Sequence, residues 1–273
     1  MTAVTATFND YDAAVRAFWA GRDLQSQKQI DSGKVDAGTR GSVTGGGHLN
    51  AMHDLIAGQF SPLLTLGAEI RKSGIIPLPG HYRRAKNWDI VVTYQGILVA
   101  AIECKSQVGS FGNNFNNRTE EAIGNAVDLW RAYEAGLVGK VKPWLGFVFV
   151  IEHSPGSTTA VRDQGKPLYR TDPTFDDSSY TERYRILFQR LVRERLYDAT
   201  CLISTAKGEG IHDEPLLEVS TKNLTAAIAG RVEYIKGLQP STLQQEGSGP
   251  SQLSLHPDLT SGNGSGSRAA TEE

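Results

Sequence analysis

Two charged side chains stand at the end of an apolar, strand-like segment. The stretch LVAAIECKS (98–106) is rich in Val, Ala and Ile, yet it contains Glu103 and Lys105. Burial of a carboxylate or an ammonium group is costly unless the group is paired or binds a metal ion. Because residues two apart in a strand point to the same face, Glu103 and Lys105 are candidates for shared chemistry.

A second carboxylate, Asp89, begins the preceding apolar run, DIVVTY. Asp89 can act with Glu103 only if both point to the same face, and that depends on the turn between the two runs. A two-residue turn would place Asp89 opposite Ile102, on the wrong face. A three-residue turn over 94–96 would bring it diagonal to Glu103 on one face. Because Gly96 suits the left-handed position that closes a three-residue hairpin, we expect the second arrangement.

Two carboxylates and a lysine suit a divalent metal ion and phosphodiester hydrolysis. Mg²⁺ takes hard oxygen ligands and retains several waters. It can polarise a phosphodiester and lower the pKa of a bound water, while a lysine orients that water or neutralises charge in the transition state. The pattern D…ExK is short and common, and on spacing alone an ordinary surface Glu–Lys pair explains it equally well.

The elements that must position these residues follow from hydrophobic periodicity. The order of elements predicts an α/β (mixed α+β) fold in which a mixed β-sheet is flanked by helices. We expect one domain over 1–237 and, because the composition turns to Ser, Gly, Gln, Thr and Pro, a disordered tail over 238–273. The expected elements are a helix over 10–20, a flexible glycine-rich loop over 21–47, helices over 48–60 and 61–72, strands over 89–94 and 97–105, a helix over 117–135, a strand over 144–152, a helix over 179–199 followed by a short strand, and a helix over 221–237.

Composition is that of a soluble globular protein. The 273 residues are 39% hydrophobic and 21% charged, and the net charge is −2, so a nucleic-acid partner must be bound by local charge. Cys104 and Cys201 lie in apolar runs and are expected to be buried free thiols in a reducing compartment. No apolar run approaches the length of a membrane helix, and the first residues lack the pattern of a signal peptide, so we expect a cytoplasmic protein without a membrane partner.

Three longer stretches are far more specific than D…ExK. They are PGHYRRAKNWDIVV, LVAAIECKSQVGSFGNNFNNRTEEAIGNAVDLW and SYTERYRILFQRLVRERLYDA. Together they resemble the XhoI family of type II restriction endonucleases, within the PD-(D/E)XK nuclease superfamily, from about Gly38 to Tyr197. The resemblance implies a restriction-endonuclease-like core, Mg²⁺-dependent cleavage of double-stranded DNA at a palindrome (CTCGAG in this family), a homodimer, and a cognate DNA methyltransferase in the same bacterium.

The resemblance also implies roles for the residues at the strand ends. Asp89 matches the first acid of the nuclease motif, Glu103 the second acid, and Lys105 the lysine. Asp89 and Glu103, with the backbone carbonyl of Cys104, are then the expected ligands of Mg²⁺. Glu69, on a predicted helix, is a candidate for an additional acid, and its plain alternative is a solvent-facing helix residue.

Basic residues gather around the two acids. Between His81 and Arg118 the only acidic residues are Asp89 and Glu103, and the five basic residues give this segment a local charge of +3. Such a field suits a DNA cleft, because phosphate contacts supply much of the affinity for DNA. The residues expected to face DNA are Arg83, Arg84 and Lys86, for which a solvated loop is the alternative.

An asparagine-rich run, GNNFNNR (112–118), follows the candidate strand. Asparagine can bond adenine bidentately and arginine can bond guanine, so part of this run is expected near DNA. Asn117 is expected to cap the following helix, with Glu120 completing a capping box, and turn formation is the alternative for the other asparagines. The DNA-facing candidates are Asn113, Asn114, Asn116 and Arg118.

Two other functions are compatible with the same pattern. One is a different nuclease of this fold, acting in DNA repair or junction resolution. The other is a DNA-binding protein that no longer cleaves, although the intact acid pair and lysine argue against it. Digestion of plasmid DNA with Mg²⁺ separates the three, because it yields discrete fragments, smears or nicks, or no cleavage.

Overall fold

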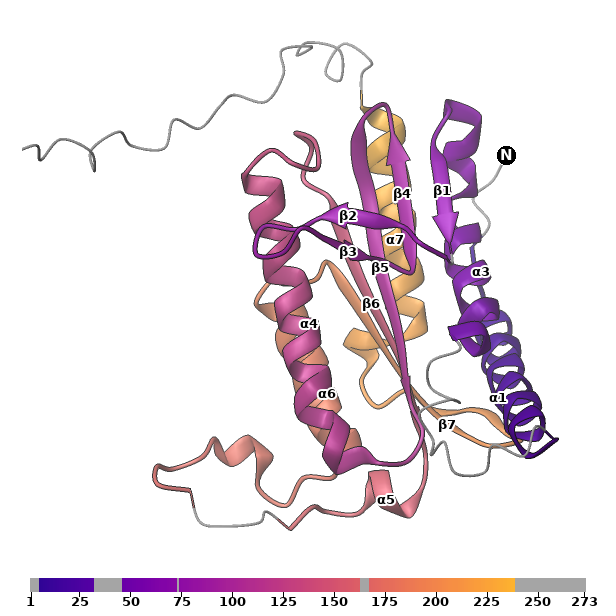
Figure 1. Ribbon diagram of the computed structural model, residues 1–273, viewed down its shortest axis with the longest axis vertical. Helices are drawn as coiled ribbons and strands as arrows, with labels where there is room; N and C mark the ends of the chain where they lie inside the picture. The colour runs from indigo at the N-terminus through magenta and orange to yellow at the C-terminus, as the bar shows by residue number, and fades with distance from the viewer. Residues whose placement is uncertain (1–4, 32–45, 73, 163–166, 239–273) are drawn as a thin grey trace, which may run out of the picture. The chain divides into compact units, whose positions relative to one another are not determined.

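The computed structural model describes residues 5–31, 46–72, 74–162 and 167–238. Its centre is a six-stranded sheet of order β1-β4-β5-β6-β7-β8 (Figure 1). Strands β5, β6 and β7 run parallel to one another, and the remaining pairings are antiparallel, so the sheet is mixed, as predicted. The strands are β1 (Glu69–Lys72), β4 (Ile90–Tyr94), β5 (Ile97–Gln107), β6 (Trp144–Glu152), β7 (Ala199–Ala206) and β8 (Gly210–Asp213).

Helices cover the sheet, which confirms the predicted fold class. Helices α4 and α6 lie together beside the strands, and α1, α3 and α7 lie on the other side (Figure 1). Within the described ranges no helix is both long and apolar enough to cross a lipid bilayer. The helices are α1 (Phe8–Asp31), α3 (Asn50–Gly58), α4 (Phe111–Glu134), α5 (Pro155–Thr158), α6 (Tyr180–Arg193) and α7 (Thr221–Gly237), with the 3₁₀ turns η1 (Gly46–Leu49), η2 (Ser61–Leu66), η3 (Pro173–Phe175) and η4 (Leu217–Val219).

A small second sheet crosses the main one. Strands β2 (Pro77–Pro79) and β3 (Ala85–Asn87) form an antiparallel hairpin that reaches from β4 toward α4 (Figure 1). The chain leaves β3 at Asn87 and enters β4 at Ile90, so this hairpin leads directly into Asp89. We call residues 77–87 the β2–β3 hairpin.

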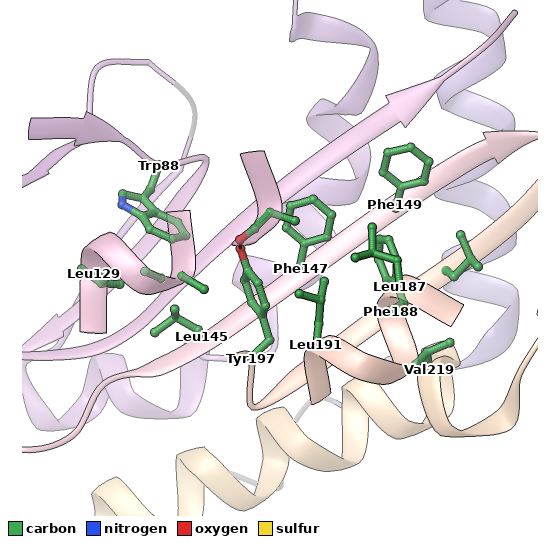
Figure 2. Close-up of a cluster of buried hydrophobic side chains, with 14 of the residues drawn as sticks. Trp88, Leu129, Leu145, Phe147, Phe149, Leu187, Phe188, Leu191, Tyr197 and Val219 are labelled. Carbon is green, nitrogen blue, oxygen red and sulfur yellow. Dashed lines mark hydrogen bonds between the residues drawn. The ribbon is translucent and has the colours of Figure 1, made fainter. Parts of the chain in front are cut away.

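The side chains of β6 contribute to an apolar core. Alternate residues of β6, including Phe147 and Phe149, pack against Phe188 of α6 and Leu129 of α4 in one buried cluster (Figure 2). Successive side chains of a strand point to opposite faces, so a strand between two helix layers must be apolar on both. In the parallel β5–β6 ladder Glu103 pairs with Phe147, which places the Glu103 side chain on the face that α4 and α6 cover.

The opposite face holds the two cysteines. Cys104 pairs with Val148, and Val148 with Cys201, in the β5–β6–β7 ladder. Both cysteines are buried and free, as predicted. Tyr11 of α1 and Thr225 of α7 share a hydrogen bond of 3.1 Å, which joins the helices of this second layer.

The N-terminal helix is longer than predicted. Residues 21–31, expected to belong to a flexible loop, continue α1 as far as Asp31. The segment is polar but rich in Arg, Leu, Gln and Lys, whose helix propensity is high. Residues 46–47 begin η1, and the remainder of the predicted loop lies outside the described residues, as does the predicted tail from 239 onward.

The predicted helix over 61–72 is wrong. The short turn η2 ends at Leu66, and the following Gly67, with a left-handed φ of +89°, closes the helical segment. The chain then forms β1, which pairs with β4 at the edge of the sheet. Glu69 therefore lies on an edge strand, opposite Thr93, and not on a helix.

Two helix boundaries also differ from prediction. Helix α4 begins at Phe111, six residues earlier than expected, so the asparagine run is helical and Asn117 caps nothing. The buried ring of Phe111 stacks on Tyr180 at 6.1 Å between centroids, and this tertiary contact fixes the start of the helix. Helix α6 begins at Tyr180, after a Ser179–Glu182 capping box and within one residue of the predicted start, but ends at Arg193, before the predicted 199.

Candidate active site

The turn between β4 and β5 has two residues and not the predicted three. Tyr94 pairs with Ile97, and the turn residues Gln95 and Gly96 have φ of +46° and +78°. Positive φ at both central positions is the geometry of the hairpin turn that matches strand twist. On its own, this turn would place Asp89 opposite Ile102, on the wrong face.

A β-bulge restores the alignment. Val92 pairs with Ala100, whereas Thr93 pairs with Leu98, so Val99 is an extra residue on β5. A shift of one residue moves every following side chain of a strand to the other face relative to its partner. Beyond the bulge Ile90 pairs with Ile102, and one further step brings Asp89 opposite Glu103.

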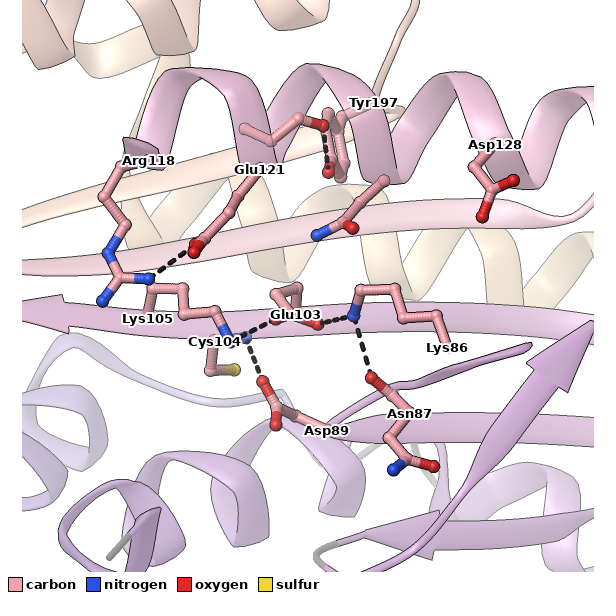
Figure 3. Close-up of polar contacts among 12 residues, drawn as sticks. Lys86, Asn87, Asp89, Glu103, Cys104, Lys105, Arg118, Glu121, Asp128 and Tyr197 are labelled. Carbon is pink, nitrogen blue, oxygen red and sulfur yellow. Dashed lines mark hydrogen bonds and ion pairs between the residues drawn. The ribbon is translucent and has the colours of Figure 1, made fainter. Parts of the chain in front are cut away.

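Asp89 is half-buried and immediately precedes β4. Its Oδ2 accepts a hydrogen bond of 2.8 Å from the backbone N–H of Cys104 (Figure 3). Burial raises the pKa of Asp89, and the negative charge of Glu103 raises it further. A carboxyl group whose pKa is raised by a neighbouring carboxylate is an arrangement that a divalent cation relieves. The contact uses the amide of Cys104, and the role of its carbonyl oxygen stays a prediction.

Glu103 is buried and bound by two lysines. Its side chain is only 4% exposed, and its oxygens accept hydrogen bonds from Lys105 on Oε1 and Lys86 on Oε2 (Figure 3). Burial is the largest influence on its pKa and would raise it. The charges of Lys86 and Lys105 together outweigh burial and hold the pKa of Glu103 below its usual value, so this carboxyl is ionised.

Lys105 lies beside Glu103 on β5, as the sequence predicts. Burial would lower its pKa, but the charges of Glu103 and Asp89 raise the pKa above its usual value. The ammonium group is therefore charged at neutral pH. Arg118 of α4 lies next to it and pairs with Glu121 at 2.5 Å (Figure 3). In the described part of the chain, Nε of Arg118 has no hydrogen-bond partner, although this atom is buried.

The guanidinium group of Arg83 is bound to side chains of α4. Its Nε donates to Oδ2 of Asp128 at 2.7 Å, and its Nη2 donates to Oδ1 of Asn125 at 2.8 Å. Oδ1 of Asp128 also accepts the backbone N–H groups of His81 and Tyr82, each at 2.8 Å. These contacts fasten the β2–β3 hairpin to α4. Sequence reasoning missed Asp128 and Asn125, although both interrupt the apolar face of a helix.

Glycine is required at position 80, where the turn of the β2–β3 hairpin begins. A Cβ atom at Gly80 would lie 2.6 Å from the carbonyl oxygen of Arg83 and 2.7 Å from Oδ2 of Asp128. Because Gly80 has no side chain, the Asp128 carboxylate can lie close enough to accept hydrogen bonds from the three residues that follow it, His81, Tyr82 and Arg83. Arg84, the next residue after Arg83, is exposed at the surface.

The remaining predicted residues are exposed or bonded to groups other than the two acids. Asn113 and Asn116 are exposed in the first turns of α4, and Asn114 donates to the carbonyl oxygen of Ser110 at 2.9 Å. Glu69 is exposed and pairs with Arg71 at 2.8 Å. Its partner in the ladder is Thr93, four residues and roughly 13 Å along β4 from Asp89. The structure does not bring Glu69 to the acid pair.

His53 of α3 is a site neighbour that sequence reasoning missed. It is buried, and burial lowers its pKa, while the charges of Asp89, Asp54 and Glu103 act in the opposite sense. Because the charges of Asp89 and Glu103 both act on this imidazole, His53 contributes to the local electrostatics of the site. The signal in the sequence was the placement of a histidine on the apolar face of a short helix.

The donor set suits a hard divalent cation. Among the residues that the structure describes, no group of three or more His, Cys, Asp or Glu side chains forms a ready-made metal cluster. Mg²⁺ does not need one, because it is held by one or two carboxylates, waters and substrate phosphates. Asp89 and Glu103 supply two carboxylates of this kind on one face of the sheet.

A mixed, helix-flanked sheet that carries two carboxylates and a lysine on neighbouring strands is consistent with the restriction-endonuclease-like class of nucleases. The family model described as restriction endonuclease XhoI matches residues 28–214. The chain belongs to the XhoI family of restriction endonucleases, which confirms the predicted family and the predicted enzyme class, a type II restriction endonuclease. No solved structure gives a significant match.

Curated relatives cover most of the chain. The type II restriction enzyme BstVI of Geobacillus stearothermophilus is 38% identical over 194 residues, which are 67% of this chain and 86% of that protein. The type II restriction enzyme XhoI of Xanthomonas vasicola is 39% identical over 191 residues, 67% of this chain and 76% of the relative. The type II restriction enzyme AbrI of Azospirillum brasilense is 45% identical over 150 residues, covering 53% and 66%.

Proposed function

We propose that this chain cleaves both strands of DNA at a palindromic site, CTCGAG, in a reaction that depends on Mg²⁺. The observation that carries the proposal is the ionised, buried Glu103, which shares one face of the sheet with Asp89 and Lys105. A buried ion pair of this kind contributes little net stability, because the cost of removing the charges from water offsets their attraction. The relatives named as type II restriction enzymes support the same reaction.

The two acids and Lys105 have different roles in the proposed reaction. Asp89 and Glu103 would hold the cation, which supplies a water of lowered pKa and stabilises the leaving oxygen. Lys105 is charged and stands beside Glu103, where its ammonium group orients the attacking water and offsets the charge that develops on the phosphate. The apolar strand β5 holds Glu103 and Lys105 at a fixed distance from each other, because its other side chains pack against neighbouring elements.

DNA would approach the face that carries Arg84 and the first turns of α4. Arg84 is exposed beside the anchored loop and suits a phosphate contact. Asn113 and Asn116 project from α4 into solvent and are available to base edges. Arg118 extends from α4 beside Lys105. Arg83 acts indirectly, because its ion pair with Asp128 holds the β2–β3 hairpin on α4.

A palindromic target calls for a two-fold symmetric enzyme. We propose a homodimer in which each protomer cleaves one strand, because protein symmetry then mirrors the symmetry of the site. We further propose that the enzyme acts in the bacterial cytoplasm beside a cognate methyltransferase that protects the host DNA.

Digestion of two matched plasmids tests the proposal. One carries a single CTCGAG site, and the other carries the same sequence with that site altered. The proposal predicts that Mg²⁺ converts only the first plasmid to one linear product, that EDTA prevents this, and that end-sequencing places the cut within the site. Random nicks, cleavage of branched DNA alone, or an uncut plasmid would each refute it and point to a repair nuclease or a non-cleaving DNA-binding protein.

A further inference from the structure

Lys86 reaches Glu103 from outside the main sheet. It lies on β3 of the β2–β3 hairpin, and its side chain is 12% exposed. Its ammonium group binds Oε2 of Glu103, donates to the carbonyl oxygen of Asn87 at 2.9 Å, and lies 4.2 Å from the centroid of the Trp88 ring. A phosphate-binding lysine of a solvated loop would make none of these contacts.

We propose that Lys86 is an exchangeable counter-ion of Glu103: it neutralises this carboxylate in the metal-free enzyme and leaves it when a divalent cation binds. Its released ammonium group then faces the DNA phosphate at the same site. The inference rests on the proposed function, because it takes Asp89 and Glu103 as the residues that hold the cation.

The charge of the site supports the exchange. The site contains two carboxylates, Asp89 and Glu103, and two ammonium groups, Lys86 and Lys105. When all four groups are ionised, their charges sum to zero. Both oxygens of Glu103 already accept a hydrogen bond from an ammonium group (Figure 3). A divalent cation at Glu103 would be repelled by both lysines at short range. One ammonium group must therefore withdraw before the cation can bind well.

Lys86 is the lysine that can withdraw at the lower cost. Lys105 lies two residues from Glu103 on the same strand, so the backbone of β5 sets its position beside this carboxylate. Lys86 has other partners within reach, the Trp88 ring and the carbonyl oxygen of Asn87, and it sits on a separate two-stranded sheet.

The exchange couples metal binding to DNA binding. While Lys86 holds Glu103, the free protein has a reduced affinity for the cation. A DNA phosphate supplies the negative charge that Lys86 loses when it leaves Glu103, so the phosphate stabilises the metal-bound arrangement. Cation and DNA should therefore bind more tightly together than separately.

Titration of the free protein with Mn²⁺, followed by the EPR signal of the unbound ion, tests the proposal without DNA or cleavage. The substitution Lys86→Met removes the charge and keeps the length of the side chain. An opposite charge within about 4–6 Å alters the ionisation constant of a carboxyl group roughly 10- to 1000-fold, so we expect Lys86→Met to bind Mn²⁺ at least about tenfold more tightly than the wild type. Lys86→Arg keeps the charge and should show no such gain.

Lys142 provides a matched control. It also pairs with a carboxylate, Asp198 at 3.4 Å, and lies over a tryptophan ring, Trp130 at 4.8 Å, but it makes no contact with Glu103. Lys142→Met should leave Mn²⁺ affinity unchanged. Equal or weaker Mn²⁺ binding by Lys86→Met, or an equal gain in Lys142→Met, would overturn the proposal.

A measurement on the wild-type protein decides the case if Lys86→Met does not fold. Acylation of lysines, mapped by peptide mass spectrometry, should increase at Lys86 when Mn²⁺ is added and stay constant at Lys142. Unchanged labelling of Lys86 would contradict the exchange. A wild-type protein that neither binds Mn²⁺ nor cleaves DNA refutes the proposed function, whereas cleavage without these Mn²⁺ effects refutes only the role of Lys86.

Discussion

The register of the β4–β5 hairpin brings Asp89 level with Glu103 because Val99 is an extra residue in β5. The two-residue turn alone would set the two acids on opposite faces, and the bulge reverses this. Bulges re-aim side chains and are frequent next to active sites. The acid pair therefore depends on a local irregularity in a strand that is otherwise fully apolar up to Glu103.

The position of Glu69 leads to a prediction of no effect. Glu69 lies on edge strand β1 and pairs with Arg71, away from the acid pair. Glu69→Gln should keep the rate of DNA cleavage within about twofold of the wild type, since the ion pair it loses is exposed and contributes about 0–1 kcal/mol. A loss comparable to that of an Asp89 variant would contradict the assignment of the site.

Asp128 should contribute to stability through the hairpin that it anchors. Its carboxylate accepts two backbone N–H groups and the guanidinium of Arg83, and its side chain is 7% exposed. Asp128→Ala leaves these donors without a partner and should lower the free energy of unfolding by about 1–3 kcal/mol in urea denaturation. Glu134→Ala is the control on the same helix, because its pair with Arg131 is exposed and should contribute about 0.5 kcal/mol or less.

The contribution of Asp128 should depend on pH. Burial would raise its pKa, but the donors from Tyr82, Arg83 and His81 lower it below the ordinary value of 3.8. A carboxyl whose pKa is lower in the folded state stabilises the fold above its unfolded pKa and loses this effect as the pH falls through the folded one. The difference in stability between the wild type and Asp128→Asn should be constant from neutral pH to about 5 and shrink below 3.8. A difference that grows on acidification would contradict this account.

Substitutions of the neighbouring residues Arg83 and Arg84 should change different properties, fold stability for Arg83 and DNA binding for Arg84. Arg84 is exposed, so Arg84→Ala should weaken DNA binding and reduce the slope of log affinity against log salt by about 0.9, the effect of one lost phosphate contact, without lowering stability. Arg83 holds Asp128 and Asn125, so Arg83→Ala should destabilise the fold by about 1–2 kcal/mol. Fluorescence anisotropy over a series of salt concentrations, together with urea denaturation, separates the two effects. An unchanged salt slope in Arg84→Ala would exclude it as a phosphate contact.

The main strands and the site motif could be predicted from the sequence because they depend on local patterns. The apolar run that ends in Glu103 and Lys105 marks β5, and the hydrophobic periodicity over 179–199 marks α6. The longer stretches around them identified the family. The bulge at Val99 could not be predicted, because this β-branched residue fits a regular strand equally well.

Non-local contacts account for the other errors. The start of α4 depends on the stacking of Phe111 on Tyr180, a residue in another helix. The pairing of Lys86 with Glu103 depends on how the β2–β3 hairpin folds across the main sheet, and no spacing along the chain encodes it. Sequence reasoning therefore placed Lys86 at the DNA surface, whereas the structure places its ammonium group inside the candidate active site.

Cleavage by Glu103→Gln tests the central claim most directly. The measurement is the single-turnover rate, with Mg²⁺, on an oligonucleotide duplex that contains one CTCGAG site, and binding is measured in parallel with Ca²⁺. We predict that Glu103→Gln cleaves at least about 10²–10³-fold more slowly than the wild type, the scale of losing one group that stabilises the transition state, while it still binds the duplex. Cleavage by Glu103→Gln at the wild-type rate would contradict the claim that Asp89, Glu103 and Lys105 form the catalytic centre.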